Sequence, residues 1–244
     1  MKKYIDESFW RKALIKPDWY LLVSNEFKRL EKIAAQEKDF QKRKLIKQEA
    51  YGILEESVKN GNLPIATSGD NLDKDRGKVN KIILHHTKNA PGMSLDRLNA
   101  IQLMRIYGSY FANPTDKLES HLKGQPVWSG HFYNNRQVFW GYHWFIRSNG
   151  QAEHILKDSY IGWHAGNWEV NKSSVGICVD DDLTYKAPSD TVLKSIAHLI
   201  NTHYSGITTD NILGHCDVNK NTECPGSQFH ENWQAKLLEL VKIP

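Results

Sequence analysis

Hydrophobic positions divide the chain into two parts that follow different periods. Over residues 6–59, apolar side chains recur at helical spacing in a background rich in Lys, Glu, Gln, Leu and Ala, which predicts two or three helices. Pro17-Asp18 is typical of a helix start, and Asn60-Gly61 of a helix stop. Residues 61–78 then carry the Gly, Pro, Ser and Asp content of a linker.

Beyond the linker, short apolar strands alternate with helical patterns. Residues 79–86 and 174–179 read as buried strands, and Asn149-Gly150 between two further strands predicts a hairpin, because a tight primed turn needs positive φ. Helices are predicted over 94–107, 189–204 and 228–241. We therefore expect an α/β fold with a mixed central β-sheet flanked by helices, preceded by an N-terminal helical extension. The expected division is 1–60 extension, 61–78 linker and 79–244 one α/β domain.

Residues 108–140 show no clear period although they contain several aromatic residues. Long connections without secondary structure are often lids or binding loops, so these aromatics could contact a ligand. They could equally pack the segment onto the body of the protein. The sequence leaves both interpretations open for Pro114, Trp128, His131, Tyr133 and Trp140.

Composition does not change the predicted fold class, but it argues against a small fold held together by disulfides. A chain of 244 residues can bury a substantial core, and its three cysteines form no even disulfide framework, which favours a reducing origin. The charge is uneven: the first 78 residues hold 17 Lys and Arg against 13 Asp and Glu, and the remainder holds 15 of each. The basic residues of 38–47 could meet an anionic partner, but a solvated helix face is the favoured interpretation.

The C-terminal loop 214–226 carries residues suited to a metal. His215 and Cys224 offer a nitrogen and a sulfur donor, the ligand types that zinc prefers, and catalytic zinc sites keep three protein ligands. The strand 79–86 ends on His85 and His86, and one of them is the expected third ligand. Adjacent strand residues point to opposite faces, so only one can turn into the site, and periodicity does not choose between them.

A family resemblance joins these features. The motifs that occur together are His85-His86-Thr87, Gly141-Tyr142-His143-Trp144, Trp163-His164-Ala165-Gly166, Ser174-Val175-Gly176-Ile177 and the loop 214–226. In this order they resemble the zinc N-acetylmuramoyl-L-alanine amidases, which include amidase-type phage lysozymes and catalytic peptidoglycan recognition proteins. The resemblance covers roughly residues 79–241 and implies that 79–244 is a zinc amidase catalytic domain.

The resemblance also implies roles for individual residues. It points to one zinc ion held by His85, His215 and Cys224, with Tyr142 and Thr222 assisting catalysis near the metal. Some relatives carry lysine where this chain has Thr222, and a hydroxyl supplies a hydrogen bond without a positive charge. The same resemblance places the substrate groove at His164, with Trp163 and Asn167 beside it.

The expected function is zinc-dependent hydrolysis of the amide between N-acetylmuramic acid and L-alanine in peptidoglycan or muropeptides. One alternative is a peptidoglycan-recognition module that does not cut. Another is an amidase whose helical extension binds a regulatory protein or an anionic polymer. No nucleic-acid partner is expected. The first residues lack the apolar core of a secretory signal and no segment reaches membrane-spanning length, so we expect a cytoplasmic location or release to the cell wall by another route.

Overall fold

The computed structural model describes residues 4–112, 126–133 and 136–241. The chain forms two compact units, which we call the helical unit and the sheet unit. The helical unit comprises residues up to Asn71 together with Ser94–Phe139, and the sheet unit comprises Leu72–Met93 together with the chain from Trp140 onward. The segment 94–139, expected to belong to the α/β domain, therefore packs with the N-terminal helices. The predicted domain boundaries, as limits of independently folding parts, stay a prediction.

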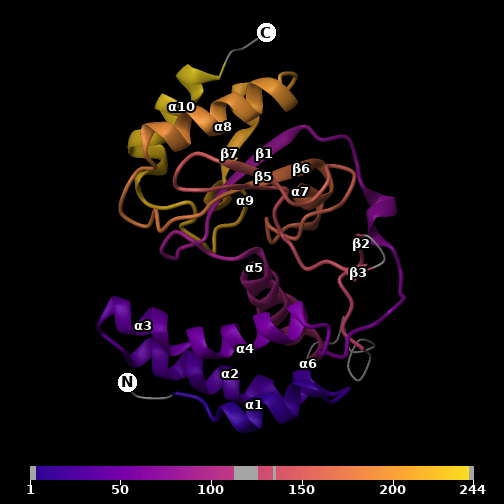
Figure 1. The fold of residues 1–244 in the computed structure, drawn as a ribbon. Helices are drawn as coiled ribbons and strands as arrows, with labels where there is room; N and C mark the ends of the chain where they lie inside the picture. The colour runs from indigo at the N-terminus through magenta and orange to yellow at the C-terminus, as the bar shows by residue number, and fades with distance from the viewer. Residues whose placement is uncertain (1–3, 113–125, 134–135, 242–244) are drawn as a thin grey trace. The chain divides into compact units, whose positions relative to one another are not determined.

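The helical unit begins with four helices, where the sequence predicted two or three. They are α1 (Glu7–Leu14), α2 (Trp19–Gln36), α3 (Phe40–Ile46) and α4 (Gln48–Lys59) (Figure 1). Acidic side chains account for two of the starts, because Asp6 accepts a hydrogen bond from the Phe9 amide and Asp39 accepts from the Gln41 and Lys42 amides. The break between α2 and α3 follows from the extended backbone at Glu37.

The segment after Ser94 completes the helical unit. Its elements are α5 (Leu95–Gln102), the π-helical turn η2 (Leu103–Gly108), α6 (Ser109–Ala112) and the short strands β2 (Phe132–Tyr133) and β3 (Arg136–Gln137). Ser94 caps α5 as predicted, accepting from the Arg97 amide, and the Arg97 guanidinium lies 2.6 Å from the Glu55 carboxylate of α4. The Trp128 ring packs edge-on against Phe111 with 5.7 Å between centroids, so this aromatic packs within its unit. Pro114 lies outside the described residues.

The sheet unit contains one five-stranded mixed sheet. Its strands lie in the order β5 (Ala152–His154), β4 (Trp144–Ile146), β6 (Ser174–Val179), β1 (Lys81–His86) and β7 (Ile212–Gly214). Strands β4, β6, β1 and β7 are parallel, and β5 pairs antiparallel with β4 through the predicted hairpin, where Gly150 adopts φ +87°. The predicted fold class, a mixed sheet flanked by helices, is confirmed.

Helices α8 and α10 pack against one face of this sheet. The remaining elements are η1 (Leu72–Asp75), α7 (Trp168–Ser173), α8 (Asp190–His203), η4 (Thr209–Asn211), α9 (His215–Val218), η5 (Phe229–Trp233) and α10 (Gln234–Leu240). Apolar side chains of α8 and α10 form a continuous core with Ile82 and Leu84 of β1. In Figure 1 these two helices lie side by side at the same end of the unit. Among the described residues, no helix combines the length and the apolar character needed to cross a membrane.

Alternation along β1 separates its two terminal histidines. Ile82, Leu84 and His86 share the face that packs against α8 and α10, whereas Ile83 and His85 point to the opposite face. His86 is 8% exposed and its Nδ1 accepts a hydrogen bond from the Leu183 amide at 2.9 Å. His85 shares the opposite face with its register partner Cys178 on β6.

Candidate metal centre

Two parallel strands deliver the first two predicted ligands to the same edge of the sheet. His85 lies near the end of β1, and His215 follows directly after β7, the parallel neighbour of β1. Parallel strands end at the same edge, so the two imidazoles meet there. Their ring centroids lie 4.6 Å apart. His85 is buried, with 1% of its surface exposed, and His215 is partly buried.

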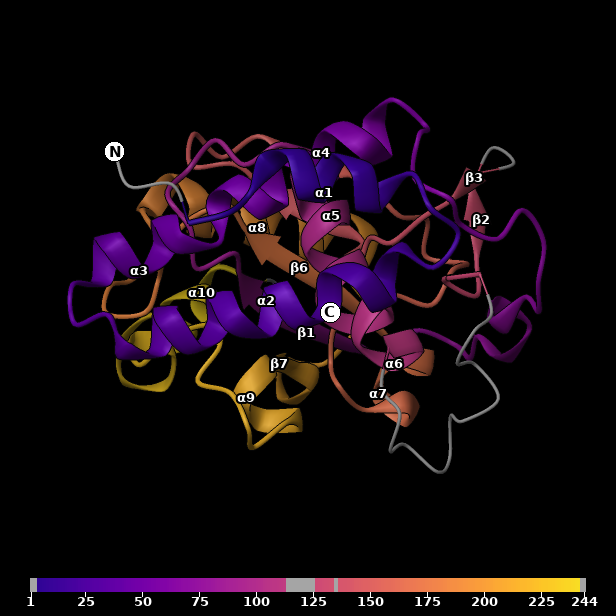
Figure 2. The ribbon, with the colours of Figure 1, turned by 90° about the horizontal axis from the view of Figure 1, so that it is seen from below.

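Backbone hydrogen bonds fold the loop after β7 so that Cys224 returns beside His215. The Cys216 amide donates to the Cys224 carbonyl at 2.7 Å, which closes the loop across its base. Gly226 then adopts φ +117°, and a Cβ at this position would overlap the Leu183 carbonyl oxygen. Only glycine fits this turn without displacing the backbone. Figure 2 shows α9 following β7 directly in this region.

The three predicted ligand atoms converge. One ligand atom from each of His85, His215 and Cys224 lies within 4.8 Å of the other two, and the His85 Nδ1 to Cys224 Sγ distance is 3.8 Å. We call these three residues the inner cluster. Two imidazole nitrogens and one sulfur form a donor set that suits zinc, with one coordination position left for solvent or substrate. Metal binding at this cluster stays a prediction.

A chain of hydrogen bonds aims the His85 ring. The Ser174 hydroxyl donates to the Val170 carbonyl at 2.6 Å, so its oxygen accepts from His164 Nε2 at 3.3 Å. His164 Nδ1 then has to accept, and it lies 3.0 Å from His85 Nε2. This sequence of donors leaves the lone pair of neutral His85 on Nδ1, the nitrogen that faces Cys224.

The fold brings His164 close enough for this contact through small residues and a buried amide. The Asn171 side-chain oxygen accepts from the His164 amide at 3.3 Å and from the Ala165 amide at 2.9 Å, which fixes the backbone of this loop. A Cβ added to Gly176 of β6 would lie 2.8 Å from the His164 ring. The missing side chain at Gly176 therefore lets the ring lie directly on the sheet.

Burial keeps these imidazoles neutral. It lowers the pKa of His85 well below the usual value, and the nearby His215 and His164 rings lower it further. Burial likewise lowers the pKa of His164, followed by the effect of His143. His143 itself has its pKa lowered to about 3, mainly by burial, and its Nε2 donates to the Tyr160 carbonyl. Neutral rings are the form that ligates metals.

The two predicted catalytic hydroxyls, those of Tyr142 and Thr222, both lie beside the inner cluster, but different contacts hold them there. The Tyr142 ring is tilted against His85 with 4.9 Å between centroids. Burial raises the pKa of the Cys178 thiol, and a hydrogen bond with Tyr142 opposes that rise. The Thr222 hydroxyl oxygen accepts from the Cys224 amide at 3.1 Å, which uses a lone pair and keeps its hydrogen for donation. Their catalytic roles stay predictions.

The predicted substrate groove residues differ in how the fold uses them. The Trp163 ring stacks on Trp168 with 5.3 Å between centroids, and Asn167 caps α7 by accepting from the Glu169 and Val170 amides. Both keep some exposed surface, whereas His164 is 5% exposed. Substrate binding by these three residues stays a prediction.

Ser174 is a site residue that the sequence did not single out for chemistry. It lies within the motif Ser174-Val175-Gly176-Ile177 and is buried at the start of β6. Strand alternation could have indicated it, because Ser174, Gly176 and Cys178 share the face of His85. Its partner His164 is ten positions away in the chain, and no local pattern predicts that contact.

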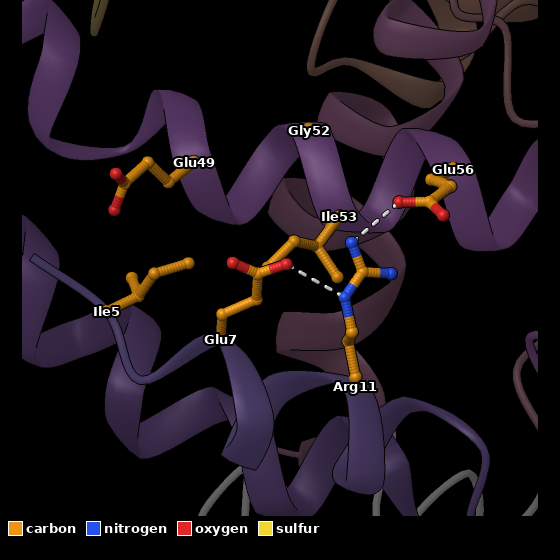
Figure 3. A pocket seen from close by; sticks show the side chains of 7 residues that line it. All are labelled: Ile5, Glu7, Arg11, Glu49, Gly52, Ile53 and Glu56. Atoms are coloured by element: carbon orange, nitrogen blue, oxygen red, sulfur yellow. Dashed lines mark hydrogen bonds and ion pairs between the residues drawn. The ribbon is translucent and has the colours of Figure 1, made fainter. Parts of the chain in front are cut away.

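The helical unit holds a separate cavity of about 220 Å³. Its lining residues are Ile5, Glu7, Arg11, Glu49, Gly52, Ile53 and Glu56 (Figure 3). Arg11 bridges Glu7 and Glu56, at 3.0 and 2.9 Å, and Glu49 adds a third carboxylate. Carboxylates outnumber cations here, so the cavity itself is unsuited to the anionic polymer considered for the helical extension.

Comparison with known proteins gave one family match. The family model described as N-acetylmuramoyl-L-alanine amidase matches residues 75–227. A search of curated proteins found no match. Similar solved structures include the N-acetylmuramoyl-L-alanine amidase LysC from Clostridium intestinale URNW, at 22% identity and TM-score 0.45, covering 73% of this chain and 91% of that chain.

Two further structures show similarity of the same order. A selenomethionine derivative of AmpD has 19% identity and TM-score 0.44, covering 74% of this chain and 93% of that chain. Drosophila peptidoglycan recognition protein SD has 18% identity and TM-score 0.40, covering 67% and 82%. Similarities this weak carry no argument about activity, and the family assignment rests on the family model, which spans more than half of the chain.

Proposed function

Because the chain belongs to the N-acetylmuramoyl-L-alanine amidase family, we propose that it is an active zinc hydrolase. Its proposed reaction is hydrolysis of the amide between N-acetylmuramic acid and the L-alanine of the stem peptide, in peptidoglycan or in muropeptides. His85, His215 and Cys224 hold one zinc ion in this proposal. The single observation that carries it is the convergence of their ligand atoms within 4.8 Å.

The ligand atoms of the inner cluster are the reason to propose hydrolysis rather than recognition of peptidoglycan without cleavage. A module that only recognises peptidoglycan does not need a thiol and two imidazoles meeting from a strand end and a distant loop. When bound, a zinc ion supplies Lewis-acid activation of water and of the scissile carbonyl. Three protein ligands are the number that catalytic zinc sites use.

Tyr142 and Thr222 stabilise the oxyanion that develops when the amide carbonyl is attacked. Both can donate an O–H from positions beside the inner cluster, and a preorganised donor of this kind typically contributes a factor of about 10² to 10³ in kcat. Neither carries a positive charge, in contrast to a lysine at the position of Thr222. Charge stabilisation therefore depends more on the metal than in the lysine-bearing relatives.

His164 acts mainly through His85. The resemblance assigns it to the substrate groove, and the bonds that join it to His85 and Ser174 favour a positioning role, because they fix which His85 nitrogen carries the proton. Trp163 and Asn167 remain the proposed substrate contacts through their exposed surfaces. Aromatic faces suit sugar rings, and an amide suits the polar groups of a peptide.

The direct test measures bond cleavage with purified peptidoglycan and, separately, with a soluble muropeptide. We expect new L-alanine amino termini to appear, and expect a chelator to abolish their release and added zinc to restore it. Cys224→Ser is the matched variant, because it removes the thiolate while keeping the side-chain size. Exposed His198 on α8 supplies the control variant His198→Ala, which should cleave normally.

Two outcomes would reject parts of the proposal. Release of L-alanine termini that ignores the chelator would exclude the zinc mechanism. Binding to peptidoglycan without any release, from protein that contains zinc, would favour the recognition module instead. The role of the helical extension in binding a protein or polymer is a separate proposal, which removal of residues 1–60 does not test cleanly because Ser94–Phe139 packs with it.

A further inference from the structure

A second group of metal-ligand side chains lies on the outer side of the same loop. Cys216, Asp217 and His230 each offer one ligand atom, and these atoms lie within 4.8 Å of one another. We call them the outer cluster. Cys216 follows His215 directly in α9, and His230 lies in η5, so consecutive residues of α9 contribute to two different clusters.

The spacing of the outer cluster matches what a zinc ion requires. The Cys216 Sγ to His230 Nε2 distance is 3.8 Å, the same as the sulfur-to-nitrogen distance in the inner cluster. Zinc lies about 2.3 Å from a thiolate and about 2.0 Å from an imidazole, which separates those two atoms by roughly 3.5 Å in a tetrahedral shell. His230 Nε2 also lies 3.0 Å from Asp217 Oδ1. Small side-chain adjustments therefore suffice to bind an ion.

Hydrogen bonds outside the cluster fix the side chains of two of its ligands, His230 and Asp217. The Gln234 amide donates to the Ile212 carbonyl at 3.5 Å, which turns its oxygen toward His230 Nδ1 at 2.8 Å. His230 Nδ1 is then the donor, so the lone pair of the neutral ring lies on Nε2, facing Asp217 and Cys216. Asp217 Oδ2 meanwhile accepts from the Gly214 amide at 2.7 Å, leaving Oδ1 for the cluster. Metal-binding histidines and carboxylates are typically supported in this way.

The geometry suits a cation between these groups. An Asp217 oxygen and a His230 lone pair face each other at 3.0 Å, and two acceptors at that distance need a proton or a metal ion between them. A proton between Asp217 and His230 satisfies these two residues but makes no bond to Cys216. A thiophilic divalent ion satisfies all three residues together.

We propose that Cys216, Asp217 and His230 form a second zinc site, accessible to solvent and separate from the inner cluster. Binding forms a bond from zinc to the Cys216 sulfur while the thiol proton passes to solvent, so no oxidant or reductant is involved. The ion joins α9 to η5 and thereby braces the segment that presents His215. Its affinity is lower than that of the inner cluster, because His230 keeps 53% of its side chain exposed and solvent weakens the electrostatic attraction between the ion and its ligands.

The experiment measures zinc per chain after the full-length protein is dialysed against saturating free zinc. We expect two ions for the wild type and for His198→Ala, the exposed-histidine control. Cys216→Ser and His230→Ala should each bind one ion and keep the wild-type circular dichroism spectrum. Cys224→Ser should lose one ion from the inner cluster and keep the outer one, so failure of the catalytic proposal is visible separately.

A second measurement needs no variant. Iodoacetamide labelling of the wild type, followed by mass spectrometry of the peptide containing Cys216, should show protection of this thiol when zinc is added. One ion per wild-type chain, with Cys216 labelled equally with and without zinc, would overturn the proposal and leave a proton-bridged Asp217–His230 pair. Two ions retained by Cys216→Ser would also overturn it, by locating the second ion elsewhere.

Discussion

The inner and outer clusters each pair a thiol with an imidazole, but the two imidazoles lie in different environments. In each, a thiol lies 3.8 Å from an imidazole nitrogen, and the other nitrogen of that ring is held by a hydrogen bond that leads to a backbone carbonyl. The hydrogen bonds from His85 run through the buried side chains of His164 and Ser174, whereas His230 of the outer cluster is half exposed. The two clusters differ in the burial of this imidazole and in their third ligand, which is the imidazole of His215 in the inner cluster and the carboxylate of Asp217 in the outer one.

This difference has functional consequences. The inner cluster is built on His85, which is buried together with His164 and Ser174, so its geometry is preorganised by packing and its electrostatic interactions are screened less by water. An exposed site exchanges its ion with solvent and stabilises the loop only when zinc is abundant. We therefore assign catalysis to the inner cluster and a structural role to the outer one.

The largest expected effect comes from removing an inner ligand. His85→Ala should lower kcat/KM for amide cleavage by about 1000-fold or more, equivalent to about 4 kcal/mol of transition-state stabilisation. Steady-state release of L-alanine termini measures this effect. His230→Ala is the matched change in the outer cluster and should leave cleavage nearly unaltered. Equal losses of kcat/KM in His85→Ala and His230→Ala would contradict the assignment of catalysis to the inner cluster and of a structural role to the outer one.

Removing a hydroxyl beside the inner cluster should have the next largest effect. Tyr142→Phe keeps the ring against His85 and deletes only the O–H, so kcat should fall by about 100-fold while zinc content stays at the wild-type value. Thr222→Val tests the second donor, with a smaller loss. A fall in zinc content, rather than in kcat, would show that these residues build the site instead of assisting catalysis.

Breaking the chain of hydrogen bonds from His85 through His164 to Ser174 should weaken zinc binding rather than slow the chemical step. His164→Ala should lower zinc affinity by about 10- to 100-fold, the usual cost of losing a residue that supports a metal ligand. Competition with a chromophoric chelator measures this affinity. At saturating zinc, kcat should largely recover. Ser174→Ala should produce a weaker form of the same change, and an altered KM with normal zinc affinity would favour the substrate-binding role of His164.

Acid should destabilise the metal-free sheet unit through its buried histidines. The pKa of His143 falls from about 6.5 in an unfolded chain to about 3 in the fold, so the unfolded state binds more protons between these values. The contribution of neutral His143 is complete above about pH 6.5 and is lost as the pH falls, by up to roughly 1.4 kcal/mol per pH unit. Urea midpoints at about pH 7 and about pH 5 measure this slope.

A variant makes the acid prediction specific. His143→Gln should lower stability near neutrality and flatten the dependence on pH, whereas His198→Gln on the exposed face of α8 should change neither. Identical slopes in the wild type and in His143→Gln would show that other groups set the acid response.

The smallest expected effect is thermal stabilisation by zinc at the outer cluster. A ligand present at about 100 times its dissociation constant stabilises the native state by about 2.7 kcal/mol. Wild-type protein that already holds zinc at the inner cluster should therefore gain a few degrees in Tm when the zinc concentration is raised further. The Cys216→Ser variant should not. A gain of the same size in Cys216→Ser would place the added zinc elsewhere.

Local patterns were enough to predict most of the sheet unit. The strands at Ile82 and Val175, the hairpin at Asn149-Gly150 and the cap at Ser189 follow from alternation, turn chemistry and capping, all of which act between near neighbours in sequence. The same reasoning correctly predicted that His85 and His86 point to opposite faces of the sheet, so that only one of them can reach the candidate metal site. It did not predict that residues 94–139 pack with the N-terminal helices, because that association depends on contacts between distant segments.

The sequence by itself was enough to predict the proposed ligand types, the strand that presents His85 and the loop that presents His215 and Cys224. Only the tertiary structure decided which atoms meet: His85 Nε2 with His164, His164 with Ser174, and Cys216 with His230 across 14 residues of chain. Such contacts depend on strand order, on the space left by Gly176 and on the path of one loop. These are properties of packing between segments far apart in the chain, and no local period encodes them.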